Sequence, residues 1–113
     1  MKKDQQIYAI RGFLETPGVI STFENVQEEA WQLVLFLRIN NLVANDLLPQ
    51  KKEEVTMDFK LMTSHLTDEG FRVLKEGLYK WLDKNDDINR TSIDMTPLEK
   101  ALAKVRSDNQ SLK

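Results

Sequence analysis

The feature that most constrains this chain is a short run of apolar residues, Leu33–Leu37, inside a longer segment with helical periodicity. Ser21 and Glu24 precede the run with capping-box spacing, in which two side chains satisfy free amides of the first helical turn. The apolar stripe continues as far as Leu42. A helix that is apolar on every side must be surrounded by other elements. The sequence therefore predicts a helix over residues 21–41 at the centre of the core.

Three more helices are predicted from apolar periodicity and boundary signals. The first covers residues 3–14 and ends before a Thr-Pro-Gly sequence that breaks helices. Another begins after Thr67, and the last begins at Thr96 with Pro97 in the first helical position. Together they predict an all-α fold, a compact bundle of four to six helices.

The chain has 113 residues, the length of one domain. We expect a single helical domain over residues 1–106 and a frayed polar tail over residues 107–113, where the apolar stripe of the last helix has ended.

In the helix after Thr67, Gly70 and Gly77 weaken the helix and could mark places where another backbone packs closely.

Residues 51–62 fit two patterns. Val55, Met57, Phe59 and Leu61 alternate with polar residues, which is the period of a strand, yet Val55, Phe59 and Met62 also have helical spacing. We favour a helix, because a single short strand near residues 55–61 would have no partner in an otherwise helical chain. If the segment is a strand, its free edges invite pairing with another chain.

Composition excludes several classes of site. The chain has no cysteine and one histidine, His65, so disulfides, thiolate nucleophiles and zinc sites built on cysteine or paired histidines are excluded. No acid–base pair, phosphate loop or cofactor motif is present, so we expect a protein that is not an enzyme and holds no cofactor or metal. No apolar run approaches the length of a membrane span, and residues 1–6 are polar, so a cytoplasmic protein is expected.

The segment 83–94 partly matches a calcium loop. Four oxygen-bearing side chains occupy its first, third, fifth and twelfth positions: Asp83, Asn85, Asp87 and Asp94. Ile88 stands at the sixth position, where the loop needs glycine, and Arg90 at the eighth, which is normally apolar. We therefore favour an Asn/Asp-rich loop between two helices.

Charge is unevenly distributed along the chain, although its net value is only −2. Residues 12–37 contain four glutamates and no lysine or arginine, and the loop 83–94 contains four aspartates against one lysine and one arginine. If the two regions share one side of the protein, they form an acidic surface for a basic partner. The simpler alternative is that the glutamates are solvent-exposed residues near the start of a helix, where negative charge is favourable, and do not bind a partner. The candidate partner-binding residues are Glu24, Glu28, Glu29, Trp31, Asp83, Asp86 and Asp87.

Two segments carry a resemblance to a known group of proteins. Leu66-Thr67-Asp68-Glu69-Gly70, the following Trp81, and Pro97-Leu98-Glu99-Lys100-Ala101-Leu102 resemble the C-terminal half of small helical immunity proteins of bacterial contact-dependent inhibition systems. The resemblance implies a stoichiometric inhibitor that binds a cognate toxin domain, often a basic nuclease, and occludes its active site. It implies no catalytic residues, because each member is matched to its own toxin.

Two functional hypotheses follow. The first is an acidic inhibitor that binds a cognate toxin protein, with neither nucleic acid nor a membrane as partner and with self-association open. The second is a small winged-helix or helix-turn-helix transcriptional regulator, whose recognition helix would carry Arg72, Lys75 and Lys80. Glu69, Glu76 and Asp83 interrupt that basic patch, which favours the inhibitor.

Overall fold

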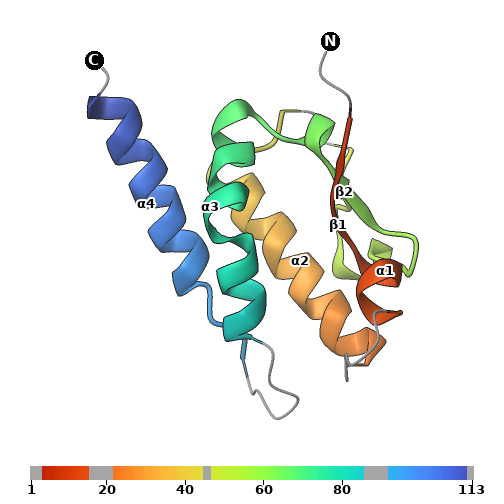
Figure 1. Ribbon diagram of the computed structural model, residues 1–113. Coiled ribbons are helices and arrows are strands. Elements are labelled where there is room, and N and C mark those ends of the chain that lie inside the picture. The colour runs from red at the N-terminus through yellow and green to blue at the C-terminus, as the bar shows by residue number, and fades with distance from the viewer. Residues whose placement is uncertain (1–3, 16–21, 45–46, 86–91, 112–113) are drawn as a thin grey trace. The chain divides into compact units, whose positions relative to one another are not determined.

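The computed structural model describes residues 4–15, 22–44, 47–85 and 92–111. It divides the chain into two compact units, Met1–Thr67 and Asp68–Lys113. The first unit contains β1 (Gln6–Ala9), α1 (Ile10–Leu14), α2 (Phe23–Ile39), η1 (Lys52–Glu54), β2 (Lys60–Met62) and η2 (Thr63–His65). The second contains α3 (Asp68–Lys84) and α4 (Thr96–Ser111) (Figure 1). The fold is mostly helical, as predicted, but it also contains a small antiparallel sheet.

Helix α2 confirms the predicted long apolar helix. Leu33, Val34, Phe36 and Leu37 are all buried. The helix begins one residue later than the capping box predicted, because the Thr22 hydroxyl accepts a hydrogen bond from the Asn25 amide at 3.2 Å. Ser21 lies outside the described residues.

The C-terminus of α2 is closed by a Schellman motif. Asn41 adopts φ 59°, a left-handed conformation that asparagine tolerates better than most residues. The Leu42 amide donates to the Leu37 carbonyl at 2.9 Å, and the Asn41 amide donates to the Arg38 carbonyl at 3.2 Å. Leu37 and Leu42 are both fully buried, which is the apolar contact that accompanies this motif.

The helix predicted over residues 3–14 is wrong in its first half, and the helix favoured over residues 51–62 is also wrong. Residues 6–9 form β1, which pairs antiparallel with β2 over residues 60–62. A strand in this part of the chain was expected to have no partner, and β1 is that partner. Tyr8 pairs with Leu61, both are buried, and a register shift lies between Gln6 and Tyr8. Long-range pairing and burial decide these two segments, whose local patterns are ambiguous.

A polar cluster attaches the start of β1 to η2. The Asp4 carboxylate accepts hydrogen bonds at 2.9 Å from the Ser64 amide, the Ser64 hydroxyl and the Thr63 hydroxyl. The Ser64 backbone bond, followed by the side-chain bonds from Thr63 and Ser64, lowers the pKa of Asp4 below its ordinary value of 3.8. The ionised carboxylate therefore stabilises the folded state.

We expect Asp4→Asn to destabilise the protein at pH 7. Because the pKa of Asp4 is lower in the folded state, its contribution is fully present above the ordinary value of 3.8 and is lost as the pH falls through the folded pKa. The free-energy difference between wild type and variant should therefore shrink on acidification, as measured by urea unfolding at pH 7 and pH 3. Glu53→Gln, at an exposed residue of η1, is the control. An equal difference at both pH values would contradict this role for Asp4.

The second unit follows the predicted boundaries closely. Helix α3 begins directly after Thr67, and α4 begins at Thr96 with Pro97 in its first turn. In α3, Leu74, Leu78 and Trp81 are buried, whereas Phe71 is 39 % exposed. Helix α4 continues to Ser111 and so includes most of the segment expected to fray.

Candidate functional site

The structure removes Glu29 from the acidic surface predicted from sequence. Glu29 is only 3 % exposed, and its Oε1 accepts a hydrogen bond from the Tyr8 hydroxyl at 3.0 Å. A carboxylate committed to a buried hydrogen bond is not available to a partner protein. Glu29 is therefore part of the interior of the first unit and not of a binding surface.

The other predicted contact residues belong to both units, or lie outside the described residues. Glu28 is half-buried, forms an ion pair with Lys52 at 2.6 Å and accepts a hydrogen bond from Gln32. Glu24 is exposed, and Trp31 is half-buried. Asp83 is exposed on α3, in the other unit, and Asp86 and Asp87 lie outside the described residues.

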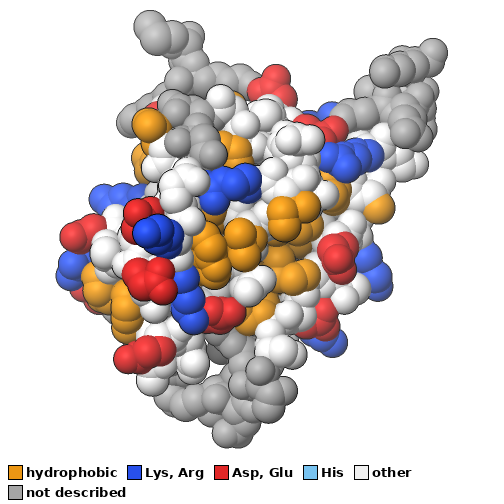
Figure 2. Space-filling model, turned by 180° about the vertical axis from the view of Figure 1, so that it is seen from behind, with side chains coloured by type: hydrophobic (Ala, Val, Ile, Leu, Met, Phe, Trp, Pro, Cys, Tyr) orange, Lys and Arg blue, Asp and Glu red, His pale blue; other side chains and the backbone are white. Residues whose placement is uncertain are grey.

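Side chains of both charges are exposed in the described part of the chain, as Figure 2 shows for one view.

The second unit contains a more clearly built feature, an antiparallel pair of helices. The Lys104 ammonium pairs with Glu76 at 3.2 Å, and the Arg106 guanidinium pairs with Glu69 at 3.2 Å. At the other end the buried Asn85 amide group donates to the Asp94 carbonyl at 3.0 Å and accepts from the Asp94 amide at 2.7 Å. These contacts fix α3 and α4 to each other along their length (Figure 1).

Gly77 allows the two helices to approach closely. A Cβ atom at this position would lie 2.7 Å from the Ala101 Cβ and 3.1 Å from the Pro97 carbonyl oxygen. The suggestion that this glycine marks close packing of another backbone is therefore confirmed. Such an approach brings the side chains that flank the contact on each helix near one another.

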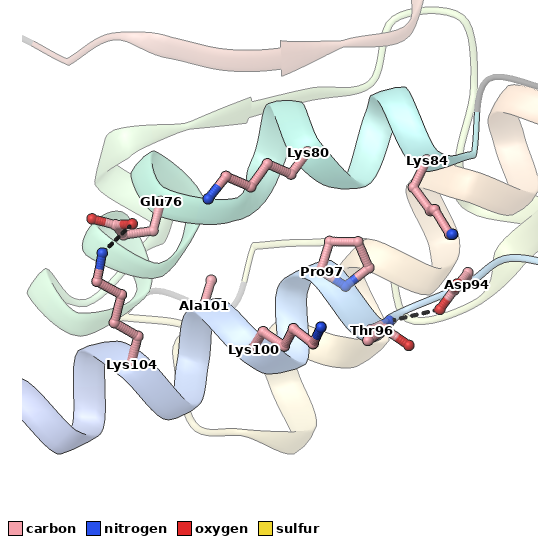
Figure 3. Close-up of a pocket in the computed structure, with 9 residues that line it drawn as sticks. All are labelled: Glu76, Lys80, Lys84, Asp94, Thr96, Pro97, Lys100, Ala101 and Lys104. Atoms are coloured by element: carbon pink, nitrogen blue, oxygen red, sulfur yellow. Dashed lines mark hydrogen bonds and ion pairs between the residues drawn. The ribbon is translucent and has the colours of Figure 1, made fainter.

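A groove of about 460 Å³ lies between α3 and α4. Helix α3 contributes Glu76, Lys80 and Lys84 to its lining. The segment before α4 contributes Asp94, and α4 itself contributes Thr96, Pro97, Lys100, Ala101 and Lys104. In Figure 3 the Glu76–Lys104 pair lies toward one end and Asp94 toward the other, with Lys80 and Lys100 between them. Four lysines against two carboxylates make the groove positively charged, in a chain whose net charge is −2.

The carboxylates at the ends of the groove already have partners. The Asp94 Oδ1 accepts a hydrogen bond from the Thr96 amide at 2.9 Å. Hydrogen bonds from the Thr96 side chain and backbone, with a smaller contribution from the charges of Lys84 and Lys100, lower the pKa of Asp94. Among the described residues, no ion pair within 4 Å involves Lys80, Lys84 or Lys100. Within the described part of the chain, each of these three ammonium groups can form an ion pair with a ligand.

Comparison of the chain with family models, with curated proteins and with solved structures found no match. The candidate site therefore stands on its geometry alone. None of the helices in the described part of the chain combines the length and the apolar character that crossing a bilayer requires.

The remaining candidates from the sequence have structural roles in the described residues. His65 Nδ1 accepts a hydrogen bond from the Met62 amide at 3.0 Å, beside η2. The Asn85 side chain, third in the calcium-loop pattern, uses its oxygen for the Asp94 amide. Asp87 of that pattern lies outside the described residues. Within the described ranges, no group of three or more His, Asp or Glu side chains is placed to hold a metal ion.

The groove was missed in the sequence although part of its signal is visible there. Lys80 and Lys84 are four residues apart, as are Lys100 and Lys104, so each pair lies along one helix face. The sequence does not show that the two pairs lie across one groove. That follows from the antiparallel packing at Gly77 and Ala101.

Proposed function

We propose that this chain is a protein-binding inhibitor of the immunity type, which acts by stoichiometric occlusion of a cognate toxin and contacts it through the groove between α3 and α4. The observation that supports the proposal is the set of three lysines, Lys80, Lys84 and Lys100, that line the groove and form no ion pair with another described residue. Like charges brought together in this way repel one another, and a negatively charged ligand would relieve that repulsion.

The segments that resemble immunity proteins support the same location. They include the first turn of α3, Trp81 near its end, and residues 97–102 at the start of α4. These are the helices that form the groove. The proposed contact surface is opposite in charge to the one expected from the sequence, since Glu29 is buried and Glu28 is ion-paired.

The test is affinity capture by the tagged chain from a lysate of the source cells, washed with rising salt. We expect wild type to retain a protein in equimolar amount, and the double variant Lys80→Glu/Lys100→Glu to lose it. The control is Lys60→Glu/Lys75→Glu, which makes the same change in net charge at exposed residues outside the groove. Purified chain should also suppress the toxic activity of the captured protein.

Two results would contradict the proposal. If the groove variant and the control retain the captured protein equally, the groove is not the contact surface. If the captured protein has no toxic activity, or keeps that activity with the chain bound, the inhibitor function is wrong.

The transcriptional regulator is retained as a second candidate because α3 exposes Arg72, Lys75 and Lys80. Under this hypothesis the exposed face of α3 enters the major groove of DNA, and Lys75→Glu should reduce duplex binding at low salt. The inhibitor hypothesis predicts that Lys75→Glu has no effect on the captured protein. The single variant Lys75→Glu therefore separates the two functions.

A further inference from the structure

We infer that the occupant of the α3/α4 groove is a short, extended, acidic segment of the partner protein, with carboxylates at alternate positions. This inference rests on the proposed binding function and adds the chemistry and conformation of what is bound. Three features carry it: the spacing of the lysines, the carboxylates that bound the groove, and the residues that line its walls.

The lysine spacing matches the repeat of an extended peptide. Residues four apart on a helix are separated by about 6 Å along its axis, which applies to Lys80 and Lys84 on α3 and to Lys100 and Lys104 on α4. In an extended chain, side chains two residues apart point to the same side and are separated by about 6.6 Å. Glutamate or aspartate at alternate positions can therefore reach successive lysines.

The ends of the groove limit the length of such a segment. Glu76, paired with Lys104, and Asp94 both carry negative charge at the boundaries, and each repels a further carboxylate. From Glu76 to Lys84 the helix advances about 12 Å, which corresponds to about four residues of extended chain. Four residues of extended chain present two carboxylates on one side, so the groove accommodates two of them within reach of Lys80, Lys84 and Lys100.

The groove walls favour a peptide over a nucleic acid. Sites for single-stranded nucleic acid combine cations with aromatic side chains on which bases stack. No residue described as lining this groove is aromatic. Exposed Tyr79 is next to Lys80 in α3 but is not part of the lining. A continuous phosphate backbone would also pass both boundary carboxylates, whereas a short acidic segment can end between them.

The experiment is an NMR titration of the isotope-labelled full chain with two capped peptides of glutamate and serine. Both peptides have three glutamates, placed at every second position in one and at every third position in the other. In an extended chain, glutamates at every second position all point to one side, whereas glutamates at every third position point to alternate sides. We expect the alternating peptide to shift amide signals of α3 and α4 around the groove and to bind several-fold more tightly. Lys80→Glu/Lys100→Glu should weaken its binding about tenfold at low salt, and Lys75→Glu should not.

Three results would overturn the inference. They are equal affinity for the two peptides, unchanged affinity in the groove variant, and tighter binding of a thymidine oligonucleotide than of the alternating peptide at the same site. These results are separable from a failure of the proposed function. If a captured toxin is lost by the groove variant while the peptides do not bind, the inhibitor function stands and the extended acidic segment is wrong.

Discussion

Replacing Trp81 with alanine should destabilise the protein by about 3–5 kcal/mol. The side chain is fully buried in α3, and its removal leaves a large apolar void that neighbouring side chains fill only in part. Urea unfolding followed by far-ultraviolet circular dichroism measures the change. The variant should begin to unfold at a much lower urea concentration than wild type, because a loss of this size is a large share of the stability of a typical domain.

The matched variant Trp81→Phe separates packing from hydrogen bonding. The indole Nε1 of Trp81 has no hydrogen-bond partner among the described residues. Substitution by phenylalanine therefore reduces the side-chain volume but removes no hydrogen bond to those residues. We expect a cost of about 1–2 kcal/mol, well below that of alanine. If phenylalanine proves as costly as alanine, Trp81 is stabilised by a polar contact and not by packing alone.

Replacing Gly77 with alanine should destabilise the protein by about 1–3 kcal/mol, although the same change in an ordinary helix stabilises it by about 1 kcal/mol. The reason for the reversed sign is the close approach to α4, where the new Cβ would lie 2.7 Å from the Ala101 Cβ. The helices must separate to admit it, which disturbs the buried contacts between them. Gly12→Ala in α1 is the control, since nothing lies within 4 Å of a Cβ there.

A second-site change tests whether Ala101 is the cause. Ala101→Gly removes the nearest contact, at a cost of about 1 kcal/mol in helix propensity. In the double variant Gly77→Ala/Ala101→Gly the two effects should not add, and the coupling energy should favour the pair by about 1 kcal/mol or more. Additive losses in urea unfolding would show that Gly77 is constrained by something other than the Ala101 side chain.

Helices α2, α3 and α4 could be predicted from the sequence because their signals are local. Each has an apolar stripe with helical spacing and a recognisable start, such as Thr96-Pro97 before α4. The two strands could not be predicted, because Gln6–Ala9 and Lys60–Met62 become strands only by pairing with each other. The local pattern of residues 3–14 predicted a helix, and that of residues 51–62 fitted a helix as well as a strand.

At the candidate site, too, local signals in the sequence and tertiary contacts determine different properties of a residue. Glu24, Glu28 and Glu29 look alike in the sequence, and only the fold places the Tyr8 hydroxyl against Glu29 and the Lys52 ammonium against Glu28. Exposure and partners of a charged side chain are properties of tertiary contacts, so a run of glutamates in a sequence does not determine an acidic surface.

The sequence by itself determined that α2, α3 and α4 are long helices, and that Lys80 and Lys84, like Lys100 and Lys104, share a helix face. These features depend on residues within one or two turns of each other. Only the tertiary structure decided that the two lysine pairs lie across one groove, because that depends on α3 and α4 packing antiparallel at Gly77 and Ala101. Helical periodicity determines which face of its own helix a side chain lies on. Packing between helices determines which side chains of a neighbouring helix it lies near.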